Sequence, residues 1–274
     1  MSFEAKQMEL AINITNSIRK AQTQQLSSVI PYVPVGYPDI ETTFEIVKKF
    51  DALGAPAVEL GIPFSDPLAD GVTIQRASQI SLENGINLKA CIQLSARLRD
   101  QGVTVPLILM GYYNTIHHYG IEQCVKEASS SGVNGFIVPD LPHEESGVMR
   151  IQTQKYGMAL VPLIALTSSE ARIEATCAGA SGFLYCVSIT GVTGMRNDLN
   201  VASLHKMMDA VRSNSDLPIA VGFGVSTRSQ VEELCSVADT VVVGSAFVQT
   251  IDSAGHDKAV DAADDLYSRL VGSK

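Results

Sequence analysis

Positive charge is scarce in this sequence. Lys and Arg number 20 against 29 Asp and Glu, which gives a formal net charge of −9 and an isoelectric point near 5.0. No basic stripe interrupts this balance, so the composition argues against nucleic acid and anionic membranes as partners. The excess of acidic residues needs no acidic or basic ligand to explain it, because a net charge keeps a protein soluble.

Metal-binding cysteine motifs and long apolar runs are also lacking. The five cysteines are widely spaced, and no C-x-x-C or Cys/His pair suggests zinc, so we expect buried free thiols in a reducing cytosol. No run reaches membrane-spanning length, and the N-terminal stretch lacks the apolar core of a signal peptide. The spacing of Leu10, Ile14 and Ile18 instead predicts an amphipathic helix that could cap the bottom of a barrel. The sequence therefore predicts a soluble cytoplasmic protein.

Several catalytic groups are missing as well. Every lysine falls in a helical or terminal stretch and none at a strand end, which argues against a Schiff-base aldolase. The histidines form no metal cluster with the carboxylates, and there is no nucleophile elbow and no G-x-G-x-x-G. His117 and His118 follow "GYYNTI", and we interpret them as residues at the start of a helix rather than as ligands.

Short apolar runs alternate with helical patterns along the whole chain. A chain of 274 residues that is 46% hydrophobic can bury a large core, and (β/α) barrels often take this length as one unit. The predicted strands are 28–33, 57–60, 106–110, 135–138, 159–164, 182–186, 219–221 and 240–243. The predicted helices include 41–53, 88–101, 121–131, 144–156, 169–178, 201–213 and 227–236. Eight such units predict an α/β fold, a single (β/α)8 TIM barrel over 1–274 with an extra N-terminal helix.

Glycine-rich turns follow the last two predicted strands, as "VGFGVST" and "VVVGSAF". Gly222 and Gly224 allow close approach of the backbone, and Ser226 or Thr227 can cap the next helix, while Gly244 and Ser245 open a short helix near Ala246. In barrel enzymes these two loops often hold a phosphate at helix N-termini. Simple turn geometry is the alternative for each turn alone, and the pair together favours phosphate.

A further loop, "SITGVTGMRND", follows the sixth predicted strand. Gly191 and Gly194 bracket Thr193, so this segment could serve as a lid over a site. An ordinary surface loop is the equal alternative.

Two carboxylates stand out in "VELGIPFSDPLADGVTIQ". Glu59 interrupts an apolar strand, where burial would raise its pKa and let it both give and take a proton. Asp70 lies on the loop above the same strand and could remain ionised to stabilise positive charge. The alternatives are a structural Glu hydrogen-bonded within the barrel and an Asp that caps the helix starting near Val72. For Asp66 a loop-stabilising role is the simpler interpretation.

Aromatic residues lie near several predicted strand ends. Tyr32, Tyr112, Tyr185 and Phe223 could face a flat apolar group, although aromatics there are more often simple core. The remaining chemistry is carboxylate acid–base catalysis on a phosphorylated substrate, without metal or cofactor.

Taken together, these segments closely resemble the tryptophan synthase alpha subunit family. The stretch from Val58 to Gln75 is nearly that family's signature, and the match extends over "LILMGYYN", "GVNGFIVPDLPHEES", "GVTG", "VGFGVST" and "VVVGSAF". The resemblance implies cleavage of indole-3-glycerol phosphate into indole and glyceraldehyde 3-phosphate by a (β/α)8 barrel.

The resemblance also implies residue roles. Glu59 matches the family's acid–base Glu, and Asp70 matches the Asp that meets the indole N–H. Tyr112 and Tyr185 match positions lining the indole pocket, and Thr193 and Gly194 lie on the closing lid. The substrate phosphate is implied at Gly222, Phe223, Gly224, Gly244 and Ser245.

Family members usually work with a beta subunit that carries pyridoxal phosphate and receives indole through a tunnel. The resemblance therefore implies an alpha2beta2 heterotetramer, with no cofactor in this chain. The loop around Pro63 and Asp66 would face that partner. The sequence departs from the family in two places, "SITGVTG" where many relatives carry "SRxGVTG", and Val72 where Pro is common.

Two other functions remain open. One is a regulatory barrel that binds the phosphate ligand and activates a beta partner but turns over poorly, and the altered lid keeps this possibility. The other is a different phosphate-binding barrel enzyme, but a metal-dependent epimerase would need metal ligands and an indole-glycerol-phosphate synthase would need a catalytic Lys at a strand end. Neither is present in the sequence.

Overall fold

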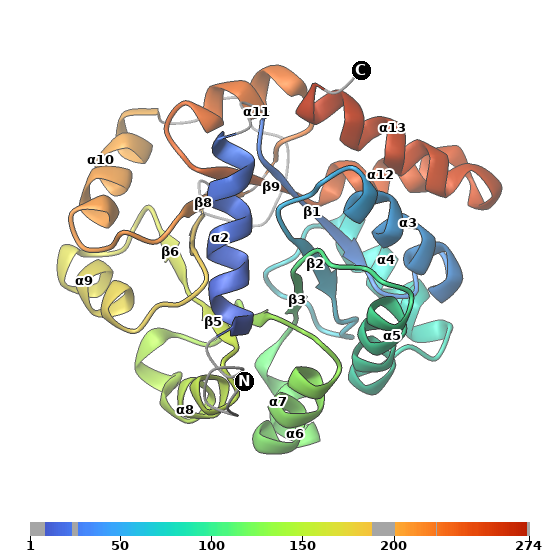
Figure 1. The fold of residues 1–274 in the computed structure, drawn as a ribbon, viewed down its shortest axis with the longest axis horizontal. Helices are drawn as coiled ribbons and strands as arrows, with labels where there is room; N and C mark the ends of the chain where they lie inside the picture. Colours follow the sequence, from blue (N-terminus) through green and yellow to red (C-terminus); the bar gives the residue numbers. More distant parts are fainter. Residues whose placement is uncertain (1–8, 24–26, 188–200, 223, 273–274) are drawn as a thin grey trace.

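The computed structural model describes residues 9–23, 27–187, 201–222 and 224–272, without the side chains of residues 9 and 201–203. Parallel strands form the centre of the molecule, and helices surround them as an outer ring (Figure 1). This is the predicted barrel of parallel strands covered by helices.

Every strand except β5 is followed by one or more helices. The strands are β1 (Val29–Pro34), β2 (Val58–Gly61), β3 (Leu107–Met110), β4 (Gly135–Ile137), β5 (Ala159–Val161), β6 (Leu163–Ala165), β7 (Leu184–Val187), β8 (Ile219–Gly222) and β9 (Thr240–Val243). The α-helices are α2 (Glu9–Thr23), α3 (Ile40–Ala52), α4 (Val72–Glu83), α5 (Leu88–Asp100), α6 (Tyr113–Tyr119), α7 (Ile121–Ser130), α8 (Gly147–Lys155), α9 (Glu170–Ala178), α10 (Val201–Arg212), α11 (Arg228–Cys235), α12 (Ser245–Ala254) and α13 (Ala259–Val271). Two 3₁₀ turns, η1 (His143–Glu145) and η2 (His256–Lys258), precede α8 and α13.

Proline splits the fifth predicted strand into two. The strand order is β5-β4-β3-β2-β1-β9-β8-β7-β6, so β5 and β6 form the two ends of the sheet although only Pro162 separates them in sequence. β5 pairs with β4 and β6 pairs with β7, so the 159–165 segment bridges the two ends of the sheet. Pro162 has no N–H for the ladder, but its carbonyl accepts a hydrogen bond from the Tyr185 N–H at 3.1 Å. The prediction of eight strands is corrected to nine on this account, with the barrel unchanged.

The N-terminal helix covers one end of the barrel. Ile14 and Ile18 are 0% exposed and belong to the same buried cluster as Ala57, Ile108 and Phe183, which lie in or next to strands. The helix lies across the barrel in Figure 1. The Thr15 hydroxyl also donates to the Gly182 carbonyl at 2.6 Å. The prediction of an amphipathic cap is confirmed.

Two separate cores follow from the alternation of side chains along each strand. One cluster fills the barrel interior, and a second, larger cluster lies between the strands and the surrounding helices. In register, Tyr32 of β1 is opposite Glu59 of β2, and Glu59 is opposite Ile108 of β3. Because Ile108 belongs to the interior cluster, these opposite residues also face the barrel interior.

The sequence prediction misplaced or omitted two helices. α6 ends at Tyr119, so His117 and His118 lie in its last turn, and their interpretation as residues at the start of a helix is wrong. α13 was not predicted, and it packs Leu266 and Leu270 into the larger core.

All five cysteines are free thiols. Four of them are buried as expected, whereas Cys235 is half-buried. None of the described helices is long and apolar enough to cross a membrane.

Candidate active site

Glu59 is a buried carboxyl group at the centre of the barrel. Its side chain is 0% exposed, and neither carboxyl oxygen has a hydrogen-bond partner among the described residues. Burial alone raises the pKa of Glu59 from 4.5 to about 8, because the charged form loses its hydration. The alternative of a structural glutamate hydrogen-bonded within the barrel is therefore wrong for the described part of the chain. At neutral pH Glu59 is mostly a neutral acid that can donate a proton.

Asp70 lies on the loop between β2 and α4 and contacts a tyrosine. The Tyr112 hydroxyl donates to Asp70 Oδ2 at 3.1 Å, and it accepts the Ala69 N–H at 2.9 Å. Burial raises the pKa of Asp70 from 3.8 to about 6, and the hydrogen bond from Tyr112 opposes that rise. The N-cap of α4 is Gly71, with no side-chain cap bond, so the alternative of Asp70 as a helix cap is wrong. Asp70 is mostly ionised at neutral pH.

The pKa values of these two carboxyl groups are thus separated by their surroundings. The apolar barrel interior keeps Glu59 protonated, whereas the Tyr112 hydroxyl favours the ionised form of Asp70. Pairs of titratable groups with separated pKa values are typical of acid–base sites.

Tyr32 and Tyr185 complete the group around the carboxyls. Burial raises the pKa of both tyrosines well above 10.0, and the charges of Glu59 and Asp70 add to that rise. Since the charge of each carboxylate affects the pKa of each tyrosine, we infer that the four side chains lie in the same region of the barrel.

Glycines at the strand ends make room for these two rings. A Cβ on Gly61 would lie 2.3 Å from the Tyr32 hydroxyl oxygen, and one on Gly222 would lie 2.2 Å from that of Tyr185. Gly244 is also close, because its Cβ would lie 3.2 Å from Tyr32 Cδ1. These glycines are therefore required by the tyrosine packing, a role that the sequence prediction missed. Their predicted contact with phosphate is an additional role that stays a prediction.

Two loop glycines and a helix start form the predicted phosphate region. Gly244 is the N-cap of α12, and Ser245 is the first residue of that helix. Gly224 has φ +75°, a left-handed conformation that favours glycine. Thr227 caps α11 through a capping box with Gln230, as the sequence suggested. The Phe247 and Val248 N–H groups donate to the Gly244 carbonyl. The first two N–H groups of α12, those of Ser245 and Ala246, have no acceptor in a preceding helical turn, which suits an anion.

Three predicted site residues lie outside the described residues, namely Thr193, Gly194 and Phe223. Among the described residues, no cluster of three or more His, Cys, Asp or Glu could hold a metal ion.

The β2–α4 loop carries two further contacts. Phe64 stacks on the Tyr112 ring with centroids 5.2 Å apart, a contact that the sequence prediction missed. The Ser65 hydroxyl donates to Asp66 Oδ2 at 2.5 Å, and the Asp66 carbonyl accepts the Leu68 N–H at 2.9 Å. These local bonds fit the expected loop-stabilising role of Asp66.

Tyr112→Phe is expected to raise the pKa of Asp70 above about 6, because it removes the hydrogen bond that favours the charged carboxylate. Carboxyl carbon NMR titration of the labelled protein measures this shift directly. The neighbouring Tyr113→Phe is the matched control, since no hydrogen bond joins the Tyr113 hydroxyl to a described residue. An unchanged Asp70 titration in Tyr112→Phe would show that the hydrogen bond from Tyr112 does not affect the pKa of Asp70.

Comparison with known proteins places these features in a family. Residues 18–270 match the family model described as tryptophan synthase alpha chain. The tryptophan synthase alpha chain of Chloroflexus aggregans is 43% identical over 260 residues, which cover 95% of this chain and 97% of that protein. The tryptophan synthase of Saccharomyces cerevisiae is 39% identical over 94% of this chain, which corresponds to 36% of the yeast protein.

Solved structures give the same result for the fold. The tryptophan synthase alpha chain from Legionella pneumophila has a TM-score of 0.84 and 30% identity, covering 95% of this chain and 96% of that one. A chain of the tryptophan synthase a2b2 complex from Pyrococcus furiosus has a TM-score of 0.81 and 33% identity, covering 90% of this chain and 98% of that one. At these scores the shared architecture extends over nearly the whole barrel.

Proposed function

The chain belongs to the tryptophan synthase alpha chain family, and from this premise we propose that it is a carbon–carbon lyase that cleaves indole-3-glycerol phosphate. The products are indole and glyceraldehyde 3-phosphate. The observation that carries the proposal is Glu59, a buried carboxyl group without a hydrogen-bond partner among the described residues and with a pKa raised to about 8. Asp70, whose pKa is lower at about 6, supplies the second carboxyl group.

Glu59 performs both proton transfers in this proposal. Its neutral form protonates C3 of the indole ring, which converts the ring into a better leaving group. The resulting carboxylate then takes the proton from the glycerol hydroxyl next to the ring. As that hydroxyl becomes the aldehyde, the C–C bond breaks and its electron pair returns to the indole. Glu59 ends the cycle protonated, and positioned proton transfer of this kind contributes about 10²–10⁴-fold.

Asp70 stabilises the intermediate of this reaction. Protonation at C3 places positive charge on the indole nitrogen, and an ionised carboxylate beside the N–H opposes that charge. The Tyr112 hydroxyl holds Asp70 Oδ2 at 3.1 Å and so fixes its orientation.

Asp70→Asn is expected to lower kcat/KM for indole release by about 10–100-fold, because it removes a charge-assisted contact worth about 1.5–3 kcal/mol. The loss falls mainly on kcat, since the positive charge exists only after proton transfer. Steady-state assays of indole release give both constants. A loss confined to KM would contradict the proposed role and assign Asp70 to substrate binding.

The remaining predicted residues bind the substrate. We assign the phosphate to the N–H groups around Gly222, Phe223, Gly224, Gly244 and Ser245. Tyr32, Tyr112 and Tyr185 line the indole pocket, and Thr193 and Gly194 belong to the lid. These contacts need no cofactor in this chain.

A partner subunit completes the proposed function. The Pyrococcus furiosus structure is described as a tryptophan synthase a2b2 complex, which supports an alpha2beta2 heterotetramer for this chain too. Its beta subunit would carry pyridoxal phosphate and convert the indole. Within that assembly, 1–274 acts as one barrel domain in the cytoplasm.

Indole release from indole-3-glycerol phosphate, by the chain alone and with a beta subunit added, tests this proposal. We expect turnover in both conditions, with a higher rate when the beta subunit is present. No turnover in either condition, with the phosphate ligand still bound, would contradict the lyase function. That outcome would favour a regulatory barrel, consistent with Ile189 where many relatives have Arg in "SITGVTG".

A further inference from the structure

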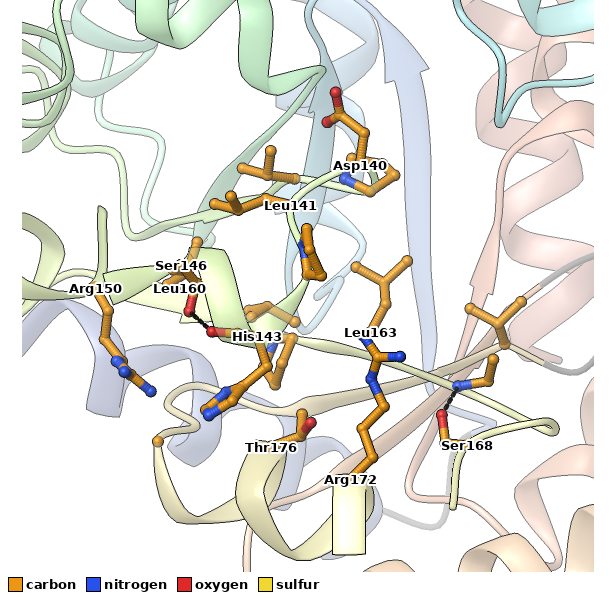
Figure 2. Close-up of a pocket in the computed structure, with 18 of the residues that line it drawn as sticks. Asp140, Leu141, His143, Ser146, Arg150, Leu160, Leu163, Ser168, Arg172 and Thr176 are labelled. Carbon is orange, nitrogen blue, oxygen red and sulfur yellow. Dashed lines mark hydrogen bonds between the residues drawn. The ribbon is translucent and has the colours of Figure 1, made fainter. Parts of the chain in front are cut away.

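A cavity lies outside the region of Glu59 and Asp70. Its volume is about 420 Å³, and it is bounded by the segment after β4, by β5 and β6, and by α8 and α9. None of the described residues assigned to the acid–base site lines it. Figure 2 shows side chains entering it from three directions, with Arg150 from α8, His143 from η1 and Arg172 from α9. A volume of this size fits a small molecule, since such sites span roughly 300–1,000 Å³.

Arg150 is the unpaired cation of this cavity. Its guanidinium has no hydrogen bond or ion pair with any described residue, although the side chain is only half-exposed. It lies across the backbone of Gly179, where an added Cβ would be 2.4 Å from Arg150 Nη1 and 3.3 Å from His143 Cε1. The absence of a side chain at Gly179 thus leaves the guanidinium beside the His143 ring with its donors unused.

Arg172 and Asp140, two other charged residues in the lining, already have hydrogen-bond partners. Arg172 Nη2 donates to Glu144 Oε2 at 2.9 Å. Asp140 accepts the Tyr113 N–H at 2.8 Å. Among the described residues, Arg150 therefore supplies the single positive charge that remains uncompensated on the cavity wall.

Apolar side chains form another part of the wall. Leu160, Pro162, Leu163 and Val187 line the cavity together with the charged groups. Leu163 and Val187 also pack against the barrel interior cluster, so this wall separates the cavity from the barrel centre. An apolar surface next to one guanidinium suits a ligand with an apolar body and one anionic end.

We propose that this cavity binds a small monocarboxylate with an apolar or aromatic body, held through its carboxylate by the Arg150 guanidinium. The planar fork of arginine matches the two oxygens of a carboxylate. A phosphate dianion fits less well, because no second unpaired Arg or Lys among the described residues lines the cavity, and Asp140 repels two negative charges more strongly than the single charge of a carboxylate. The site goes beyond the proposed lyase function and does not depend on it.

Benzoate is a suitable probe, with benzamide as its neutral counterpart and inorganic phosphate as the anion without an apolar body. Titration of the full chain followed by amide NMR is expected to show saturable benzoate shifts at Gly179 and Arg150. Benzamide and phosphate are each expected to bind at least tenfold more weakly at these residues. Equal binding of benzamide would show that charge has no role. Tighter binding of phosphate would show that the ligand class is wrong.

Two variants test the role of Arg150. Arg150→Gln is expected to weaken benzoate binding about 10–100-fold, the usual loss for a hydrogen bond to a charged group. Gly179→Ala keeps every charge but displaces the guanidinium, so a severalfold loss is expected. Lys155→Gln is the matched control, because it removes one positive charge from α8 at an exposed residue paired with Glu122, and binding is expected to be unchanged.

An assay of indole release distinguishes a failure of this proposal from a failure of the proposed lyase function. Arg150→Gln is expected to keep its basal indole release while losing benzoate binding. Benzoate shifts that persist unchanged in Arg150→Gln, or that occur at Tyr32 and Gly244 instead of Gly179, would overturn the proposal. Neither result would bear on whether the chain is a lyase.

Discussion

Glu59→Gln is expected to lower kcat for indole release by about 10²–10⁴-fold, the contribution of a positioned general acid–base group. Glutamine keeps the size and shape of the side chain but cannot donate a proton to indole C3 or accept one from the glycerol hydroxyl. Because Glu59 has no hydrogen-bond partner among the described residues, no hydrogen bond to them is lost in the exchange. KM should therefore change little, while kcat carries nearly the whole loss.

Steady-state assays of the chain alone and with its beta subunit measure this loss. Glu83→Gln provides a control with the same chemical change at the exposed end of α4. It is expected to retain the activity of the unmodified chain. A Glu59→Gln variant with activity within tenfold of the parent would assign the proton transfers to another group and remove the central argument for the mechanism.

The sequence predicted much of the fold because its patterns are local. Buried strands such as β9 (Thr240–Val243) appear as continuous apolar runs bounded by turn residues, and the predicted bounds 240–243 are confirmed. The cap formed by α2 was predicted from the spacing of Ile14 and Ile18, which both reach the barrel interior. The break at Pro162 was missed, because the apolar run continues through it. Only the pairing of β5 and β6 with different neighbours reveals two strands.

The candidate site was predictable where a residue violates its local pattern. Glu59 is conspicuous as a carboxylate in an apolar strand, and the structure confirms its burial. The bond between Tyr112 and Asp70 was not predictable, since it joins residues 42 positions apart in sequence. The same holds for Gly222, whose missing side chain accommodates the Tyr185 ring from the neighbouring strand. Turn geometry and close packing against another strand select the same residue type, so the sequence could not distinguish them.

Glu59 is also expected to make the stability of the chain fall as pH rises. Its pKa is about 8 in the folded chain against 4.5 for the ordinary group. Below pH 4.5 the group is protonated in both the folded and the unfolded states and has no effect. Between 4.5 and about 8 the folded state holds a proton that the unfolded state has released, so the free energy of unfolding decreases with pH. Above about 8 the group is ionised in both states and the full penalty applies.

The size of this effect is measured by the difference in the free energy of unfolding between the parent chain and the Glu59→Gln variant. Three pH units inside the window, from about pH 5 to about pH 8, correspond to a loss of about 4 kcal/mol in the free energy of unfolding. The variant lacks the titrating group and should escape this loss. Asp70, whose pKa is raised to about 6, contributes a fall of the same sign but is present in both proteins and cancels.

Urea unfolding of the parent chain and of Glu59→Gln at about pH 5, about pH 6.5 and about pH 8 gives the free energies of unfolding to compare. We expect the two stabilities to be similar at the lowest pH and to diverge steadily, with Glu59→Gln the more stable protein at the highest. Parallel curves would mean that Glu59 carries no proton at neutral pH, and the neutral acid required for protonation of indole C3 would be absent. A variant that is more stable but inactive would instead show that the barrel tolerates a buried carboxyl group at a cost in stability because the chemistry requires it there.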